Sequence, residues 1–322
     1  MKGLPEEFLQ RLRAIVPANR YDGVLRTFEH GKPVTFRVNT LKANVRDVLE
    51  NLKQAGFKLG NVPWMKEAFL LQNRRQRDLE ETAEYEQGRI YLQNLSSMVP
   101  PIVLDPRPGE KVLDLAAAPG SKTTQMAAMM ANGGSITAVD DNEVRLEKLK
   151  ANLVRQGVSC AECVHANGAV VGNDRPEAFD RVLLDAPCGS EGRFLTGIPR
   201  SYSYWRVEKV RKNAREQKRL LLSALRALCV GGTMVYSTCT FAPEENEGVL
   251  SWALERFPDA IGVEPVKLPF ANTQTGLRVW EGKDYPEGVG RSVRILPTDS
   301  MEGFFVAKIF KRGSMPRSVD EE

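Results

Sequence analysis

The sequence predicts an α/β protein with a doubly wound, mostly parallel sheet, preceded by a small α+β module. Two observations predict this fold. From residue 111 onwards, short apolar runs alternate with stretches of helical period, an order typical of parallel strands joined by helices. Ahead of them, a helical N-terminus is followed by a strand, a helix and a second strand. A chain of 322 residues is long enough for two domains.

Apolar spacing predicts the elements of the N-terminal module. Phe8, Leu9, Leu12 and Ile15 follow helical spacing, and residues 34–38 alternate like a strand. Residues 45–52 carry the stripe of an amphipathic helix that ends at Gly56, and residues 68–71 form a second apolar run. We expect residues 1–89 to form this module with its leading helices, residues 90–312 the larger domain, and residues 313–322 a tail.

The larger domain is predicted to alternate strands and helices. The expected strands are residues 111–115, 135–139, 161–165, 181–184 and 233–237, and the expected helices are residues 121–131, 142–156, 205–228 and 243–257. Asn142 is expected as an N-cap, Gly157 as a C-cap and Pro243 as the first residue of its helix. In such sheets, ligands bind beyond the carboxyl ends of the strands.

Composition excludes several classes of protein. The chain has no apolar run near the roughly 20 residues that span a membrane, and its N-terminus has no apolar signal core. We therefore expect a cytoplasmic protein without membrane contact. Two histidines argue against a Ser-His-Asp site, and the pair Cys160 and Cys163 has no second ligand cluster, so we expect no metal. Five cysteines, an odd number, favour free thiols, and the net charge of +4 permits a polyanionic partner.

A loop of small residues follows the strand at 111–115, and it consists of Ala116, Ala117, Ala118, Pro119, Gly120, Ser121 and Lys122. Small residues at the start of a helix let backbone N–H groups approach a ligand closely. Asp140 ends the next strand, where a carboxylate can accept both hydroxyls of a ribose. A tight turn or a solvated Asp would explain either feature alone. The two features in this order favour a nucleoside-bearing cofactor, with S-adenosylmethionine as the leading candidate.

Two cysteines lie just past two predicted strands of the sheet. Asp185 and Cys188 follow the strand at 181–184, and Cys239 follows the strand at 233–237. If these strands are parallel neighbours, both thiols lie at the ligand-binding edge. A single buried thiol is usually core filler, but two of them beyond a cofactor loop favour a catalytic role.

The motifs that carry these residues resemble a known family. Residues 113–123, 185–188, 236–240 and 243–247, with 36–40 and 91–98 upstream, are similar to the signature blocks of the NOL1/NOP2/Sun (RsmB/RsmF-like) family of RNA cytosine-5 methyltransferases. The resemblance covers most of residues 30–310. It implies a class I methyltransferase fold with an RRM-like, RNA-binding N-terminal module, S-adenosylmethionine as cofactor, and a cytosine in RNA as substrate.

The chemistry of cytosine methylation gives the thiols a purpose. A nucleophile that adds at C6 makes C5 able to attack a methyl donor, and a thiolate is both a strong nucleophile and a competent leaving group. Spacing leaves open which cysteine attacks, since DNA cytosine-5 methyltransferases use a Pro-Cys nucleophile. The resemblance implies attack by Cys239 and product release by Cys188, with Asp185 as the acid or hydrogen-bond partner at N3.

The resemblance also implies the cofactor contacts. Residues 116–122 would surround the methionine portion, Asp140 would bind the ribose, Asp185 would lie near the methyl donor, and Arg145 would order the cofactor helix. Asn167 stands where the family usually has Asp beside the adenine. A second departure is the order Cys188-Gly189-Ser190, where Ser-Gly is commoner, and we expect little consequence from it.

A basic segment follows the Pro-Cys motif, and Tyr202, Tyr204 and Trp205 lie among its charges. We expect it to track RNA phosphates and stack bases, through Arg193, Arg200, Arg206, Arg211, Lys212 and Arg215. Because the chain ends soon after the predicted catalytic domain, we favour rRNA slightly over tRNA as the substrate. We also expect a monomer. The alternatives are a DNA cytosine-5 methyltransferase and a catalytically silent RNA-binding or ribosome-assembly factor.

Overall fold

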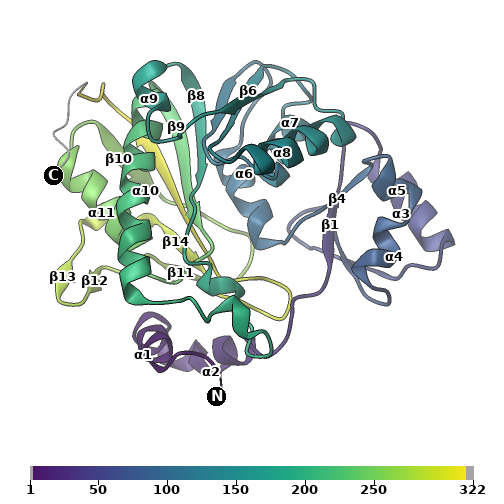
Figure 1. Cartoon of the computed structure of the whole chain (residues 1–322), viewed down its shortest axis with the longest axis horizontal. Coiled ribbons are helices and arrows are strands. Elements are labelled where there is room, and N and C mark those ends of the chain that lie inside the picture. The colour runs from purple at the N-terminus through teal and green to yellow at the C-terminus, as the bar shows by residue number, and fades with distance from the viewer. Residues whose placement is uncertain (1–2, 317–322) are drawn as a thin grey trace.

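The computed structural model describes residues 3–316, and its strands form a four-stranded sheet, a nine-stranded sheet and a two-stranded ribbon (Figure 1). The two larger sheets lie side by side, with the N-terminal sheet adjacent to helices α7 (Ser121–Met129) and α8 (Glu143–Gln156). Within residues 3–316, no helix is both long and apolar enough to cross a membrane. Of the predicted tail, residues 317–322 lie outside the described part of the chain.

The N-terminal sheet has the topology of an RRM. Its strands are β1 (Thr35–Val38), β2 (Leu59–Asn61), β3 (Ala68–Leu71) and β4 (Ile90–Leu92), paired antiparallel in the order β2-β3-β1-β4. The helices α3 (Val45–Gln54), α4 (Gln76–Glu80) and α5 (Ala83–Glu86) connect them in βαββαβ order. The predicted boundary after residue 89 falls immediately before β4, which pairs with β1, so this sheet extends to Leu92.

One face of the N-terminal sheet is buried against the larger domain. Arg37 of β1 is 2% exposed and donates hydrogen bonds to Gln93 Oε1 (2.9 Å) and to Thr124 Oγ1 of α7 (2.6 Å). Tyr91 of β4, on the same side, is also buried, and the Arg37 guanidinium lies 5.1 Å from the centre of its ring. An RRM binds bases on its open sheet face. Here that face holds the two domains together.

The leading helices pack on the larger domain rather than on the N-terminal sheet. α1 (Glu6–Ile15) and α2 (Ala18–Arg26) lie below the large sheet in Figure 1. Phe8 of α1 packs against Phe194 and Trp205, with ring centroids 5.1 and 5.8 Å apart. Residues 4–28 therefore cover the segment that follows Cys188, although the sequence analysis grouped them with the N-terminal module.

The large sheet confirms the predicted fold class. Five parallel strands run in the order β7-β6-β5-β8-β9, and they are β5 (Lys111–Asp114), β6 (Ser135–Asp140), β7 (Ala161–His165), β8 (Phe179–Asp185) and β9 (Leu228–Thr238). Antiparallel strands extend this sheet beyond β9 and were not predicted, and they are β15 (Phe304–Lys311), β14 (Val293–Ile295), β11 (Thr273–Thr275) and β10 (Ile261–Glu264). β12 (Val279–Trp280) and β13 (Lys283–Asp284) form the separate ribbon.

Helices cover both faces of the large sheet, as a doubly wound fold requires. α9 (Val171–Asp174), α10 (Val207–Ala227) and α11 (Glu247–Arg256) pack on one face, and α6 (Val99–Leu104), α7 and α8 lie on the other (Figure 1). Neighbouring strand residues point to opposite faces: Leu113 and Leu184 pack with α10, whereas Val112 and Leu183 pack with α6 and α7.

The predicted helix ends are confirmed for α8 but not for α11. Asn142 Oδ1 accepts a hydrogen bond from Arg145 N (3.0 Å), and Gly157 ends the helix with φ +69°. Pro243 was predicted to start its helix, which is wrong, since α11 begins at Glu247. Residues 243–246 form turns instead, because Gly248 N bonds to Pro243 O and Asn246 N also points to that carbonyl.

Candidate active site

A cavity of about 400 Å³ opens beyond the carboxyl ends of β5 and β8. The strand order reverses at this point of the sheet, since β5 lies between β6 and β8, and such switch points are where α/β proteins bind ligands. Its walls come from both domains and from the start of β15: Tyr91, Leu92, Gln93, Asn94, Ser97, Asp114, Ala116, Ala117, Ala118, Pro119, Ser121, Lys122, Arg145, Asp185, Arg193, Cys239, Glu302 and Phe304.

The small-residue loop at 116–122 forms one wall of the cavity. Gly120 has φ +103°, and a Cβ there would lie 2.7 Å from Leu149 Cδ1, so only glycine fits this turn. Ala118 N donates to Asp140 Oδ2 (3.1 Å), and Arg145 Nη2 donates to Ala118 O (2.6 Å). Arg145 also pairs with Asp140 at 3.4 Å. Asp140 at the end of β6 and Arg145 of α8 thus hold the loop in place.

Asp185 is held by a lysine and a hydroxyl at the floor of the cavity. Its Oδ2 pairs with Lys122 Nζ at 2.6 Å, and its Oδ1 accepts from Ser237 Oγ at 2.7 Å. Lys122 Nζ also donates to Ser97 Oγ (2.8 Å). Asp114, behind them, accepts from Thr123 Oγ1, and burial raises its pKa to about 7. Lys122 and Ser237 therefore fix the orientation of the Asp185 carboxyl group, which faces the cavity.

The two predicted thiols lie next to each other. Cys188 Sγ and Cys239 Sγ are 3.4 Å apart, and both cysteines are free. The hydrogen bond between them raises the pKa of Cys188, and burial raises it further. The same hydrogen bond lowers the pKa of Cys239, against the opposing effect of burial. One hydrogen bond thus shifts the pKa values of the two thiols in opposite directions.

Residues 245 and 246 hold the two loops that carry the thiols. Both carboxylate oxygens of Glu245 accept from Gly189 N, at 3.2 and 3.1 Å, and Oε2 also accepts from Gln217 Nε2 (2.7 Å). Asn246 Nδ2 donates to Thr240 O at 2.9 Å. Glu245 thus fixes the backbone after Cys188, and Asn246 fixes the backbone after Cys239. The sequence motif drew attention to this segment but did not reveal these contacts.

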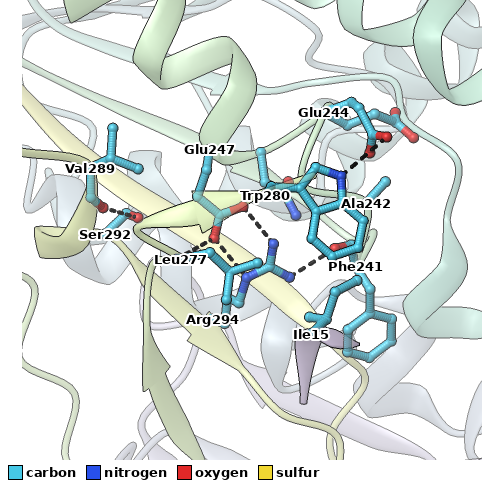
Figure 2. A network of polar contacts seen from close by, with 12 residues as sticks. Ile15, Phe241, Ala242, Glu244, Glu247, Leu277, Trp280, Val289, Ser292 and Arg294 are labelled. Atoms are coloured by element: carbon cyan, nitrogen blue, oxygen red, sulfur yellow. Dashed lines mark hydrogen bonds and ion pairs between the residues drawn. The ribbon is translucent and has the colours of Figure 1, made fainter. Parts of the chain in front are cut away.

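A buried ion pair between Arg294 and Glu247 contacts the segment that follows Cys239, at Phe241 (Figure 2). Arg294 Nη2 and Nε donate to Glu247 at 2.5 and 2.7 Å, and Arg294 Nη1 donates to Phe241 O at 2.8 Å. Glu247 Oε1 also accepts from Leu277 N (3.0 Å). Both side chains of the pair are fully enclosed. β14, α11 and the segment after Cys239 are therefore joined by one polar network.

Comparison with known proteins identifies the family. The family model described as 16S rRNA methyltransferase RsmB/F matches residues 101–310, and the model of the N-terminal domain of 16S rRNA methyltransferase RsmF matches residues 4–95. The chain belongs to this methyltransferase family. The family predicted from the motifs is thereby confirmed.

Individual relatives agree with this assignment. The chain is 43% identical over 279 residues to the tRNA (cytosine(49)-C(5))-methyltransferase of Pyrococcus abyssi, covering 86% of this chain and 88% of the relative. It is 39% identical over 320 residues to ribosomal RNA small subunit methyltransferase F of Klebsiella pneumoniae, covering 97% of this chain and 64% of the relative. The chain therefore spans less than two thirds of that relative. A methyltransferase homologue from Pyrococcus horikoshii has a similar structure, with a TM-score of 0.82, 37% identity, and 97% and 96% coverage of the two chains.

Most of the predicted cofactor residues of this family member line the cavity, but three do not. Gly120 belongs to the loop and makes its turn, and Asp140 supports the loop through Ala118 N, but neither residue is among the cavity walls. Asn167 is exposed, and its Oδ1 accepts a hydrogen bond from Ala169 N within its own turn (2.9 Å). Asn167 thus stabilises a turn after β7 and is not among the cavity walls.

The predicted RNA-binding residues are exposed, whereas two of the three aromatic residues among them are not. Arg200, Arg206, Arg211, Lys212 and Arg215 are solvent-exposed, as is Arg193, which also lines the cavity. Tyr202 and Trp205 are 9% and 8% exposed, because they pack on α1 and Trp205 Nε1 donates to Glu191. The prediction that RNA bases stack on these two rings is therefore wrong. Tyr204 is the exposed aromatic residue of this segment.

Sequence reasoning missed Glu302 and Phe304. Both reach the cavity because β15 runs antiparallel to β9, with Phe305 opposite Thr238. Burial raises the pKa of Glu302, which pairs with Arg193 at 3.5 Å. The three remaining cysteines, Cys160, Cys163 and Cys229, are free and partly buried. Over residues 3–316, no group of three or more Cys, His, Asp or Glu side chains is arranged to hold a metal ion.

Proposed function

We propose that this chain is an S-adenosylmethionine-dependent RNA cytosine-C5 methyltransferase that acts through a covalent adduct between Cys239 and C6 of the base. The observation that carries the proposal is the pair of thiols, 3.4 Å apart, beside Asp185 and the small-residue loop. A cytosine must leave its stack to reach Cys239, since attack at C6 requires access to the face of the ring.

The residues of the cavity fit the cofactor. A volume of about 400 Å³ lies within the range of small-molecule sites, and the alanines and Gly120 leave the loop backbone open to a ligand. Residues 116–122 and Arg145 would hold the cofactor, with Asp140 supporting the loop. When bound, S-adenosylmethionine supplies an electrophilic methyl group.

The side chains divide the work of the reaction. The Cys239 thiolate adds to C6, and the electron pair displaced by this addition moves to N3. Asp185, oriented by Lys122, acts as the acid and gives its proton to N3. After C5 has accepted the methyl group, water takes the C5 proton, and the electron pair of that bond forms the C5–C6 double bond again. Cys239 leaves C6 as a thiolate, and N3 returns its proton to Asp185. Cys188, protonated and in contact with Cys239, assists this release. The raised pKa of Cys188 and the lowered pKa of Cys239 support this division.

The substrate is proposed to be RNA, with rRNA preferred over tRNA. Both matching family models are described as 16S rRNA methyltransferases, whereas the relative from Pyrococcus abyssi is named for tRNA. Mapping cytosines that lose bisulfite resistance when the gene is deleted would identify the target. A target in tRNA would overturn the preference for rRNA and leave the reaction intact.

The reaction is tested with labelled S-adenosylmethionine on total RNA, DNA and protein. We expect label in RNA alone, no activity in Cys239→Ala, and a protein–RNA adduct that survives denaturing electrophoresis in Cys188→Ala. Cys160→Ala, in a thiol away from the cavity, is the matched control and should resemble the wild type. Label in DNA, or a Cys239→Ala protein that still methylates RNA, contradicts the proposal, as does an absence of label in all three pools.

A further inference from the structure

Ser190 adopts a backbone conformation that L-residues rarely adopt. Its φ and ψ are +55° and +29°, in the left-handed region where Cβ crowds the following carbonyl and which costs a residue other than glycine about 1–2 kcal/mol. The residue begins the turn that leads from Cys188 into the helical turn Glu191–Arg193, and Arg193 N donates to Ser190 O (3.0 Å). A glycine would make this turn without strain, so the serine side chain calls for another explanation.

The Ser190 hydroxyl is in contact with the proposed nucleophile. Ser190 Oγ lies 3.5 Å from Cys239 Sγ, within hydrogen-bonding distance for sulfur. Two residues later, Gly192 N donates to Cys239 O at 2.9 Å. A Cβ at Gly192 would lie 2.2 Å from Gly303 O, so this approach requires glycine. The turn therefore contacts Cys239 through both its backbone and its sulfur.

We propose that Ser190 is a catalytic residue whose hydroxyl donates a hydrogen bond to the Cys239 thiolate, stabilising it before attack on C6 and again when it leaves. This inference rests on the proposed function, which makes Cys239 the nucleophile. Strained conformations persist at active sites where the surrounding structure holds them, and here the strain places the hydroxyl against the sulfur.

Ser190 offers Cys239 a hydroxyl donor, which the other neighbours of Cys239 do not. Besides Ser190, the groups that act on Cys239 are Asp185 at the end of β8 and Cys188 and Arg193 from the segment that follows it. Lys122 and Glu302 line the same cavity. Cys188 donates to the thiolate but also exchanges protons during release. Arg193 favours the thiolate, and Asp185 opposes it. A serine hydroxyl does not ionise near neutral pH, so it remains a donor throughout the reaction.

The test measures the ionisation of Cys239 itself. The rate at which iodoacetamide alkylates Cys239 is determined across pH, by mass spectrometry of the peptide that contains this residue. The Cys188→Ala background removes the other sulfur donor. There, Ser190→Ala and Ser190→Gly are expected to raise the pKa of Cys239 by about one unit, the shift expected when a thiolate loses a charge-assisted hydrogen bond. Alkylation at pH 7 should then be about ten-fold slower and should recover at high pH, because only the thiolate reacts.

Two comparisons make the result decisive. Ser203→Ala, an exposed serine of the same segment, should leave the pKa of Cys239 unchanged. Ser190→Gly should also raise Tm by about 2 °C, because it removes the strain that Ser190→Ala keeps. A pKa of Cys239 unchanged in both Ser190 variants would overturn the proposal, and an unchanged Tm in Ser190→Gly would contradict the strain. Because alkylation needs neither RNA nor methyl transfer, failure of this proposal is distinguishable from failure of the proposed function.

Discussion

Replacing Arg294 by Met should strongly destabilise the protein. Arg294 and Glu247 are 2% and 0% exposed at their side chains, and two hydrogen bonds join them (Figure 2). Met has a similar length and is apolar, so it fills the space of the arginine stem without replacing its charge. The substitution leaves the Glu247 carboxylate enclosed with Leu277 N as a remaining donor, and it leaves Phe241 O without its guanidinium donor.

The expected loss follows from the burial of the pair. Removing one partner of a buried ion pair costs about 3–5 kcal/mol, because the other charge remains desolvated. Domains are stable by about 5–15 kcal/mol, so the variant would lose at least about a fifth of that margin. The free energy of unfolding of a chain of this size falls steeply with urea concentration. A loss of about 3–5 kcal/mol should therefore lower the urea midpoint by about 1 M.

Urea unfolding followed by circular dichroism measures this loss, and a double variant separates charge from packing. Glu247→Leu combined with Arg294→Met removes both charges, and the combined loss should be smaller than that of Arg294→Met alone. Arg294→Lys keeps a charge but not the fork that bonds Glu247 twice, and should lie between the wild type and Arg294→Met. A loss below about 1 kcal/mol in Arg294→Met would refute the reasoning, as would a double variant less stable than the single one.

Three further predictions concern the domain contact, a buried carboxyl and RNA. Arg37→Met should lower the free energy of unfolding by about 2 kcal/mol in urea, because charge-assisted hydrogen bonds to α7 are lost; an unchanged midpoint would contradict this. Burial raises the pKa of Glu245 from 4.5 to about 8, so its folded form binds the proton more tightly and loses stability as pH rises through this range. Glu245→Gln should therefore gain Tm relative to the wild type between pH 5 and 8, and a constant difference would contradict the shift. Changing Arg211, Lys212 and Arg215 to Glu should weaken RNA binding and reduce the slope of log K against log salt by about 2–3, which filter binding at several salt concentrations checks; an unchanged slope would count against an RNA contact.

The parallel half of the large sheet could be predicted because its signals are local. Each strand from β5 to β9 is a short apolar run followed by a turn or a helix, and the small-residue loop directly follows β5. The proximity of the two thiols could be predicted for the same reason, since β8 and β9 are parallel neighbours that end at one edge of the sheet. Geometry of this kind follows from the order of elements alone.

The antiparallel half could not be predicted, because its contacts join segments far apart in the chain. β15 pairs with β9 across about 70 residues, and this pairing brings Glu302 to the cavity. The burial of Tyr202 and Trp205 likewise depends on α1, about 190 residues earlier. An aromatic residue among arginines has the same local pattern whether it packs on a distant helix or faces RNA.

The order of Gly189 and Ser190 shows how a distant residue determines a local sequence. A Cβ at Gly189 would lie 2.8 Å from Glu245 Oε1, and that carboxylate bonds to Gly189 N. A side chain at this position would displace the Glu245 carboxyl group from Gly189 N, so glycine suits the loop that Glu245 holds. The serine then falls at the left-handed position, where it is strained but lies 3.5 Å from Cys239 Sγ. The sequence expectation of little consequence treated the two residues as a flexible turn, whereas their order follows from two contacts with the segment after β9.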